Sequence, residues 1–189
     1  VIEVTGFKGS LIKSINDKKF AGNIMDTINA EDVGKNTDQN IADALGRVTG
    51  VSIVSRNGEG ASITVRGASA EQNNISLNGQ QLTSTEFSQS VDLSSYSADI
   101  LDRLEVIKTP SADHEEGALG ANVNLKTLRP LNRQKLVRSL NYQARYNDLS
   151  EEDNYKLSGT ITEKFLDETL GIAFSAYKET NAYRKDEIR

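Results

Sequence analysis

The chain has 189 residues, of which 37% are hydrophobic and 26% are charged. This length suits one ordinary domain, or one domain and part of another, and the apolar share supports a core, which excludes wholesale disorder. A net charge of -5 argues against nucleic acid as a partner, and the absence of cysteine together with the single His114 excludes disulfide frameworks, thiol nucleophiles and multi-histidine metal centres.

Residues 1 to about 132 predict a mixed segment of short helices and strands. Two helices are expected, with Ser10 and Thr37 as their N-caps. Their apolar residues are Leu11, Ile12 and Ile15 in the first helix and Ile41, Ala42, Leu45 and Val48 in the second. Gly50 stands where the end of a helix favours a left-handed residue.

Short β-branched runs follow, and they predict strands. The runs cover residues 51–54, 63–65, 75–77, 104–107 and 123–125. Turn signals separate them at Asn57-Gly58, Glu59-Gly60 and Asn78-Gly79. The polar stretches 68–74 and 82–95 predict long loops, which in compact domains are often functional.

Residues 133 to 189 have a period of two. Apolar residues alternate with small or polar ones over 139–146, 155–162 and 170–177. One apolar and one polar face is typical of membrane-spanning β-strands, and also of an ordinary half-buried antiparallel meander. Three strands cannot close and leave two edges, so we expect either a fragment or a sheet that needs a partner. The start at Val1, without an initiator Met or a signal peptide, is expected of a mature or trimmed product.

Several blocks in the first 125 residues resemble, in order, the plug domain of TonB-dependent outer-membrane receptors. The blocks are residues 1–6, 41–53, 63–67, 75–79 and 101–112, the last continuing through 116–125. Thr49 stands where the family usually has Pro, and Asn78 where it usually has Asp. An acidic stretch at 113–116 replaces a common Tyr-Gly stretch, which looks more like the carbohydrate-uptake branch of the family.

The resemblance implies an α+β fold. A plug domain with a small mixed β-sheet and short helices would be followed by about three antiparallel strands of a transmembrane β-barrel of roughly 22 strands. The domains would be a TonB box at 1–6, the plug at 7–132 and the truncated first strands of the barrel wall at 133–189. The location implied is the outer membrane of a Gram-negative bacterium, with the plug in the barrel lumen and the N-terminus in the periplasm.

The function implied is energy-coupled transport of a scarce nutrient, with an oligosaccharide as the expected substrate. A siderophore or cobalamin receptor is the alternative, and a signalling module that relays ligand occupancy is another. The partners implied are the C-terminal domain of TonB, energised by ExbB and ExbD, the nutrient and outer-membrane lipid. We expect no cofactor, no bound metal and no nucleic acid.

Three groups of site residues follow from the resemblance. Val1, Ile2, Glu3, Val4 and Thr5 would bind TonB by adding a strand to its sheet, unless they are simply a frayed first strand. The residues expected to face substrate are Arg56, Asn57, Glu59, Glu86, Phe87 and Gln89. Arg66 and Lys108 would lock the plug to acidic residues of the wall, and both side chains should be solvent-exposed where that wall is absent.

Catalysis is not expected. His114 lies among carboxylates, but the sequence has no nucleophile elbow or triad pattern, and the neighbouring carboxylates lack the cleft of a glycosidase.

A third reading is a soluble carbohydrate-binding or adhesin domain. It predicts that the face of Leu140, Ile161 and Phe174 is buried on the first segment. The transporter reading predicts that this face turns outward, that Asn141, Gln143, Thr160 and Ser175 take the opposite face, and that Tyr142, Tyr146, Tyr155 and Phe165 lie in aromatic belts.

Overall fold

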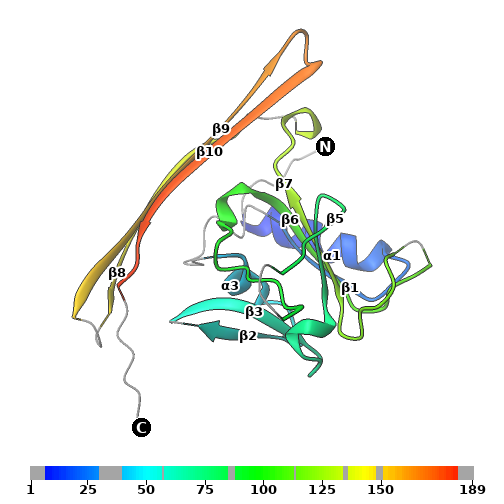
Figure 1. The fold of residues 1–189 in the computed structure, drawn as a ribbon. Coiled ribbons are helices and arrows are strands. Elements are labelled where there is room, and N and C mark those ends of the chain that lie inside the picture. The colour runs from blue at the N-terminus through cyan, green and yellow to red at the C-terminus, as the bar shows by residue number, and fades with distance from the viewer. Residues whose placement is uncertain are drawn as a thin grey trace. The chain divides into compact units, whose positions relative to one another are not determined.

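The computed structural model describes residues 7–29, 40–56, 58–84, 88–112, 114–133, 136–147 and 151–182. The chain forms two compact units that divide between Thr127 and Leu128 (Figure 1). The proposed assignment of 1–6, 7–132 and 133–189 to box, plug and wall stays a prediction, with the structural division a few residues earlier than residue 132.

The first unit combines short helices with two sheets. Its helices are α1 (Phe7–Phe20), α3 (Ile41–Leu45) and the 3-10 turns η1 (Ala70–Gln72) and η2 (Ala98–Ile100). Its strands are β1 (Met25–Asn29), β2 (Val51–Arg56), β3 (Glu59–Val65), β4 (Asn74–Leu77), β5 (Gln80–Gln81), β6 (Leu101–Ile107) and β7 (Asn122–Thr127). All five predicted strands of this segment are therefore confirmed, whereas β1 was not predicted.

The larger sheet has the order β1-β6-β7-β4-β5, and β2 pairs with β3 in a separate hairpin. β4 and β7 run parallel, with Ile75 opposite Val123, and the other pairs are antiparallel. The expected small mixed sheet is thus present. Parallel neighbours need a long connection, and here the chain between β4 and β7 supplies β6 on the way.

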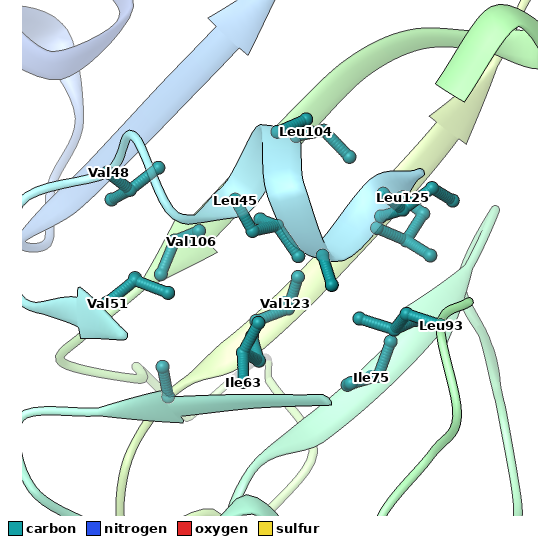
Figure 2. Close-up of a cluster of buried hydrophobic side chains, with 14 of the residues drawn as sticks. Leu45, Val48, Val51, Ile63, Ile75, Leu93, Leu104, Val106, Val123 and Leu125 are labelled. Atoms are coloured by element: carbon teal, nitrogen blue, oxygen red, sulfur yellow. The ribbon is translucent and has the colours of Figure 1, made fainter. Parts of the chain in front are cut away.

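The core lies between α3 and one face of the larger sheet. Ile41, Ala42 and Leu45 of α3 are completely buried, and the hydrophobic cluster includes Leu104, Val106, Val123 and Leu125 from β6 and β7. Figure 2 shows Leu45 among side chains that come from these strands and from Ile63 of β3. The predicted apolar face of the second helix is therefore confirmed.

The N-cap of α3 is Asn40, and the predicted cap Thr37 lies outside the described residues. The Asn40 side-chain oxygen accepts from the backbone N–H of Asp43 at 3.1 Å, and its Nδ2 donates to the carbonyl of Gly60 at 2.9 Å. One residue thus caps the helix and ties it to β3. Gly50 has a φ of +80° just before β2, in the left-handed region that the sequence indicated.

The first helix begins at Phe7, so the predicted N-cap at Ser10 is wrong. Ser10 is buried inside α1, which lies along β1 through polar contacts. Asn29 of β1 donates from Nδ2 to Ser14 Oγ at 2.8 Å, while Leu11, Ile12 and Ile15 are exposed. The Ser10 backbone carbonyl accepts from Asn29 Nδ2 at 3.5 Å, so this residue contacts β1 from within the helix. None of the helices in the described part of the chain is long and apolar enough to cross a lipid bilayer.

Two turn predictions had different outcomes. Asn78 and Gly79, with φ of +53° and +87°, join β4 to β5, as a two-residue hairpin requires. Glu59 and Gly60, in contrast, are not a turn but the first residues of β3. Gly60 lies under α3, where a Cβ would be only 3.1 Å from the Cβ of Ala42, so its role is close packing rather than turning.

The second unit is an antiparallel sheet of three strands in the order β10-β9-β8, preceded by the 3-10 turn η3 (Pro130–Asn132). The strands are β8 (Arg138–Asn147), β9 (Glu152–Phe165) and β10 (Leu170–Thr180), and each contains one of the predicted alternating runs. Leu166, Asp167 and Glu168 all have positive φ in the tight turn between β9 and β10.

Substituting Gly60 with Ala should lower the free energy of unfolding by about 1–3 kcal/mol, because the added methyl meets Ala42 and Ile53 in a packed interface. Gly22 is the matched control: nothing lies within 4 Å of its Cβ position, so Gly22→Ala should stay within about 0.5 kcal/mol of the parent. Urea denaturation followed by circular dichroism measures both, and equal effects of the two substitutions would contradict the packing role of Gly60.

Candidate functional site

The residues expected to face substrate form two groups, Arg56 to Glu59 and Glu86 to Gln89, and the chain that follows the second group contacts β3. Arg56 and Glu59 are opposite one another at the tip of the β2–β3 hairpin, and Arg56 is exposed. After the second group, the backbone N–H of Leu93 donates to the carbonyl of Ala61 in β3 at 2.7 Å. Gln89 is exposed in this segment. Asn57, Glu86 and Phe87 lie outside the described residues, so their contacts with substrate stay predictions.

The two basic residues expected to lock the plug lie at strand ends, as predicted, and contact each other. Arg66 directly follows β3 and Lys108 directly follows β6. The Arg66 guanidinium donates from Nη1 to the backbone carbonyl of Lys108 at 3.0 Å. Arg66 has a φ of +54°, which is uncommon for a residue with a side chain.

Lys108 does not have the exposed side chain that the sequence led us to expect. Only 8% of the side chain is exposed, and Nζ binds Asp26 Oδ2 at 2.6 Å and the carbonyl oxygen of Thr49. The prediction is wrong because β1, which was not foreseen, brings a carboxylate beside β6. A buried ammonium without such a partner would carry a large desolvation penalty.

Asp26 holds two lysines at once. Its Oδ1 accepts from Lys18 of α1 at 2.5 Å while Oδ2 accepts from Lys108. Partial burial raises the pKa of the Asp26 carboxyl, but the hydrogen bonds and charges of Lys108 and Lys18 outweigh it, and the net pKa lies below the ordinary value of 3.8. These contacts connect the ends of β1, β3 and β6 with the turn before β2, through Asp26, Arg66, Lys108 and Thr49.

The three-stranded sheet has opposite exposure on its two faces. Leu140 and Phe174 are 79% and 67% exposed, and the apolar residues at 157, 161 and 172 are also exposed, whereas Thr160 is 3% exposed. The packing of this face on the first segment, which the third reading expected, stays a prediction. Asn141 pairs with Ser158 and Ser175 with Thr160, so these polar residues share the opposite face, as the transporter reading predicted.

The polar face of this sheet is a connected network. Thr160 and Ser175 share a hydrogen bond of 2.9 Å between their hydroxyls, and Arg145 Nη2 binds Glu179 Oε1 at 2.7 Å. Asn154 binds the backbone of Ala182 through both side-chain atoms. This face is therefore lined by polar side chains that bond one another, as the lumen side of a barrel wall requires.

Aromatic residues lie at both ends of the apolar face. Tyr142, Tyr146 and Tyr155 lie toward the end that carries the 148–151 connection, and Phe165 lies beside the turn at the other end. Tyr155 and Phe165 are about 33 Å apart along β9 at 3.3 Å per residue. A strand tilt of about 40° reduces this to roughly the 25 Å of an outer-membrane apolar band. The belts themselves stay a prediction.

The remaining predicted residues either lie outside the described ranges or make few contacts. The TonB box, Val1 to Thr5, lies outside the described residues. His114 is half-buried, and its Nδ1 lies 3.0 Å from Ser111 Oγ. In the described ranges no group of three or more His, Cys, Asp or Glu side chains is arranged to hold a metal ion.

Sequence reasoning missed Asp26, Glu105 and Asn122. Glu105 is 7% exposed and its carboxylate binds Arg103 and Lys126 at 2.9 and 3.0 Å. The alternation of Arg103 and Glu105 in one strand and of Asn122 and Asn124 in its partner was a usable signal, since polar residues repeating every two positions mark one face. No local signal linked Asp26 to Lys108.

Replacing Lys108 with Gln should lower the free energy of unfolding more than replacing Lys18 with Gln. The Lys108 side chain is 8% exposed and the Lys18 side chain 57%, and exposed ion pairs contribute little. Denaturation at neutral pH measures both variants. Equal losses would contradict the ranking.

The pH dependence provides an independent check on Asp26. A pKa depressed below 3.8 in the folded state means that the carboxylate stabilises the fold fully above that value and progressively less as pH falls through the folded-state pKa. The stability gap between the parent and Asp26→Asn should therefore close in strong acid. A gap that stays constant from neutral to strongly acid pH would exclude this role.

Comparison with protein families gives one match. Residues 17–122 match the family model described as the TonB-dependent Receptor Plug Domain. The match covers more than half of the chain and includes α1 in part and every strand from β1 to β6.

Solved receptors share the fold over most of the chain. The ferric citrate transporter FecA, unliganded, has 20% identity and a TM-score of 0.71, over 96% of this chain and 29% of its own. The siderophore receptor PirA from Acinetobacter baumannii has 20% identity and a TM-score of 0.64, over 87% and 25%. A variant of the ferric enterobactin receptor PfeA from Pseudomonas aeruginosa has 20% identity and a TM-score of 0.61, over 94% and 26%.

The chain thus spans between a quarter and a third of the length of these receptors. The order of a plug-like mixed sheet followed by antiparallel strands is shared with all three. The chain belongs to the TonB-dependent receptors of the Gram-negative outer membrane, and residues 17–122 are its plug domain.

Proposed function

We propose that this chain is the plug and the first wall strands of a transporter that actively carries a scarce nutrient across the outer membrane. The observation that carries the proposal is the reversed exposure of β8, β9 and β10, where apolar side chains face out and a hydrogen-bonded polar face lies behind them. An apolar outer face suits lipid, and a polar inner face suits an aqueous lumen that a plug must fill.

Energy for transport would enter through the N-terminal segment. The segment from Val1 to Thr5 is short and mostly β-branched, and Gly6 separates it from the start of α1 at Phe7. A segment of this kind can add a strand to the edge of another protein's sheet through its backbone hydrogen bonds. The partner proposed is the C-terminal domain of TonB, with ExbB and ExbD supplying energy from the proton gradient.

Arg66 is the better placed of the two residues proposed to lock plug and wall. Arg66 is exposed, and its Nη1 donates to the carbonyl of Lys108. Lys108 is already neutralised by Asp26 inside the plug. We therefore assign contact with acidic wall residues to Arg66. The role assigned to Lys108 is to hold its own backbone carbonyl in place as the acceptor for the Arg66 guanidinium.

Two substrate classes remain candidates. Neutral oligosaccharides are favoured by the amide and charged groups of the outer segments, Arg56, Glu59 and Gln89, which suit hydroxyls, and by Phe87, which can stack on a sugar face. Siderophores are favoured by the likeness of the chain to a siderophore receptor and a ferric enterobactin receptor. At 20% identity these likenesses support the fold and leave the substrate to experiment.

Replacing Val4 with Pro should abolish binding to the TonB C-terminal domain, since proline removes one backbone donor from the added strand. Val4→Ala keeps the N–H and is the matched control, which should bind nearly as the parent does. Pull-down and nutrient uptake measure the pair. Undiminished binding by the proline variant would show that Val1 to Thr5 do not act by strand addition.

Phe87→Ala should weaken uptake of the true substrate, because one stacking surface is lost. The assay compares neutral oligosaccharides with ferric siderophores in cells with and without TonB. Uptake of either class that is TonB-dependent supports the transport proposal and identifies the class. If every tested uptake is the same without TonB, the proposal fails.

A further inference from the structure

An apolar groove of about 560 Å³ lies on the apolar face of the three-stranded sheet. At its centre, Gly159 of β9 stands between Leu140 of β8 and Ala176 of β10 in the strand register. The large side chains that line the groove are all exposed: Leu140, Leu157, Ile161 and Phe174. The groove is therefore a local hollow in a face of bulky apolar side chains.

The sheet itself does not require a glycine at position 159. A Cβ at this position would have Leu140 Cδ1 and the Ser139 carbonyl oxygen as its nearest neighbours, both at 3.7 Å, which is ordinary van der Waals contact. The φ of Gly159 is not positive. A glycine inside a strand weakens it, and often marks a point where a ligand approaches the backbone closely.

Two charged side chains line the groove, and both are basic. Arg138 forms an ion pair with Glu163 and is thereby neutralised. Lys178 is exposed, and among the residues that the structure describes it forms no ion pair. A groove with an apolar floor and one uncompensated ammonium group complements a molecule that has an apolar chain and an anionic group.

The two charges mark the ends of the groove. Lys178 is opposite Leu157 and Arg138 is opposite Ile161, so they lie four residues apart along β9, about 13 Å at 3.3 Å per residue. Tyr142 is opposite Leu157 from the other side, which puts a phenol donor at the level of Lys178. The anionic group therefore belongs at the Lys178 end, and the chain over Gly159.

The charge at this end selects among anionic lipids. A phosphodiester carries one negative charge, which one ammonium group balances. A phosphomonoester carries about -1.5 to -2 at neutral pH, so a lipid with two such groups would need a cluster of basic side chains. Lys178 alone therefore favours a glycerophospholipid with one net negative charge.

We propose that the groove binds one acyl chain of such a lipid, represented by phosphatidylglycerol, with its phosphodiester at Lys178 and Tyr142. The inference rests on the proposed transport function for the placement of this face in lipid. Since lipid tails cover the whole face in a bilayer, the groove gains van der Waals contact with the chain rather than a hydrophobic driving force. Lys178 supplies the preference for the anionic headgroup.

The test is native mass spectrometry of the purified full-length protein in a neutral detergent. The probes are dimyristoylphosphatidylglycerol and dimyristoylphosphatidylcholine, which share their chains and differ in net charge. We expect the parent to bind the anionic lipid about fivefold more tightly, the effect of one basic residue near a membrane surface. Lys178→Gln should remove this preference, and Lys178→Arg should keep it. Because Lys178 is exposed, neither substitution threatens the fold.

A second pair of variants tests the groove. Gly159→Leu fills the hollow and should weaken the binding of both dimyristoyl lipids severalfold. Ala144→Leu is the matched control, because Ala144 is exposed on the same face, opposite Tyr155, and does not line the groove. It should leave binding unchanged. A preference that survives Lys178→Gln, equal effects of the two leucine substitutions, or tighter binding of a lipid with two phosphomonoesters would overturn the inference.

Uptake assays separate this inference from the transport proposal. If uptake depends on TonB but the headgroup preference is indifferent to Lys178, the lipid site falls and transport stands. If the preference follows Lys178 while uptake is the same without TonB, the lipid site stands and the transport proposal falls.

Discussion

The apolar face of β8, β9 and β10 is stable only where the surroundings are themselves apolar. In water, a surface that exposes residues such as Leu140 and Phe174 would be covered by another protein or would aggregate. In lipid, exposing the same surface carries no free-energy penalty. Polar side chains then take the other face and bond one another, as Thr160 and Ser175 do. The first unit, described by itself, likewise carries polar side chains on one face of its larger sheet, among them Glu105 and Asn124.

Much of this fold follows from the sequence because its strands are marked locally. The runs that became β2, β3, β4, β6 and β7 are β-branched and bounded by turn residues, and the alternating runs of β8 to β10 fix which face each side chain takes. The apolar face of α3 was equally clear. Such signals depend on neighbours in the sequence, so no knowledge of the tertiary structure was needed.

The misses share a cause, which is polar burial between distant segments. β1 has few apolar residues, and it forms because Asn29 binds α1 and Asp26 binds Lys108, a residue 82 positions away. Ser10 was taken for a cap because serine usually avoids helix interiors, yet here it is buried against a strand. Lys108 was expected in solvent because the wall that would pair with it is absent, and the pairing with Asp26 was not foreseen. Of the candidate site, the positions of Arg66 and Lys108 at strand ends were predictable, and their contacts were not.

The polar face of the plug sheet also shows how charge can be arranged without leaving a net field. Glu105 lies between Arg103 and Lys126, and asparagines fill the adjacent positions. A surface of neutral amides is readily wetted, because each hydrogen bond exchanged with water changes the free energy little.

β1 is the edge strand of its sheet and the one nearest the N-terminus, and this has a mechanical consequence. A load applied to the first residues would pass through α1 and arrive at Met25, where β1 is paired on one side, with β6. The bonds that resist first are those beside it: Ile24 to Lys108 and Thr109, and Asp26 to Lys108. Once they yield, the strand can be peeled away pair by pair, while β7, held between β6 and β4, keeps its place.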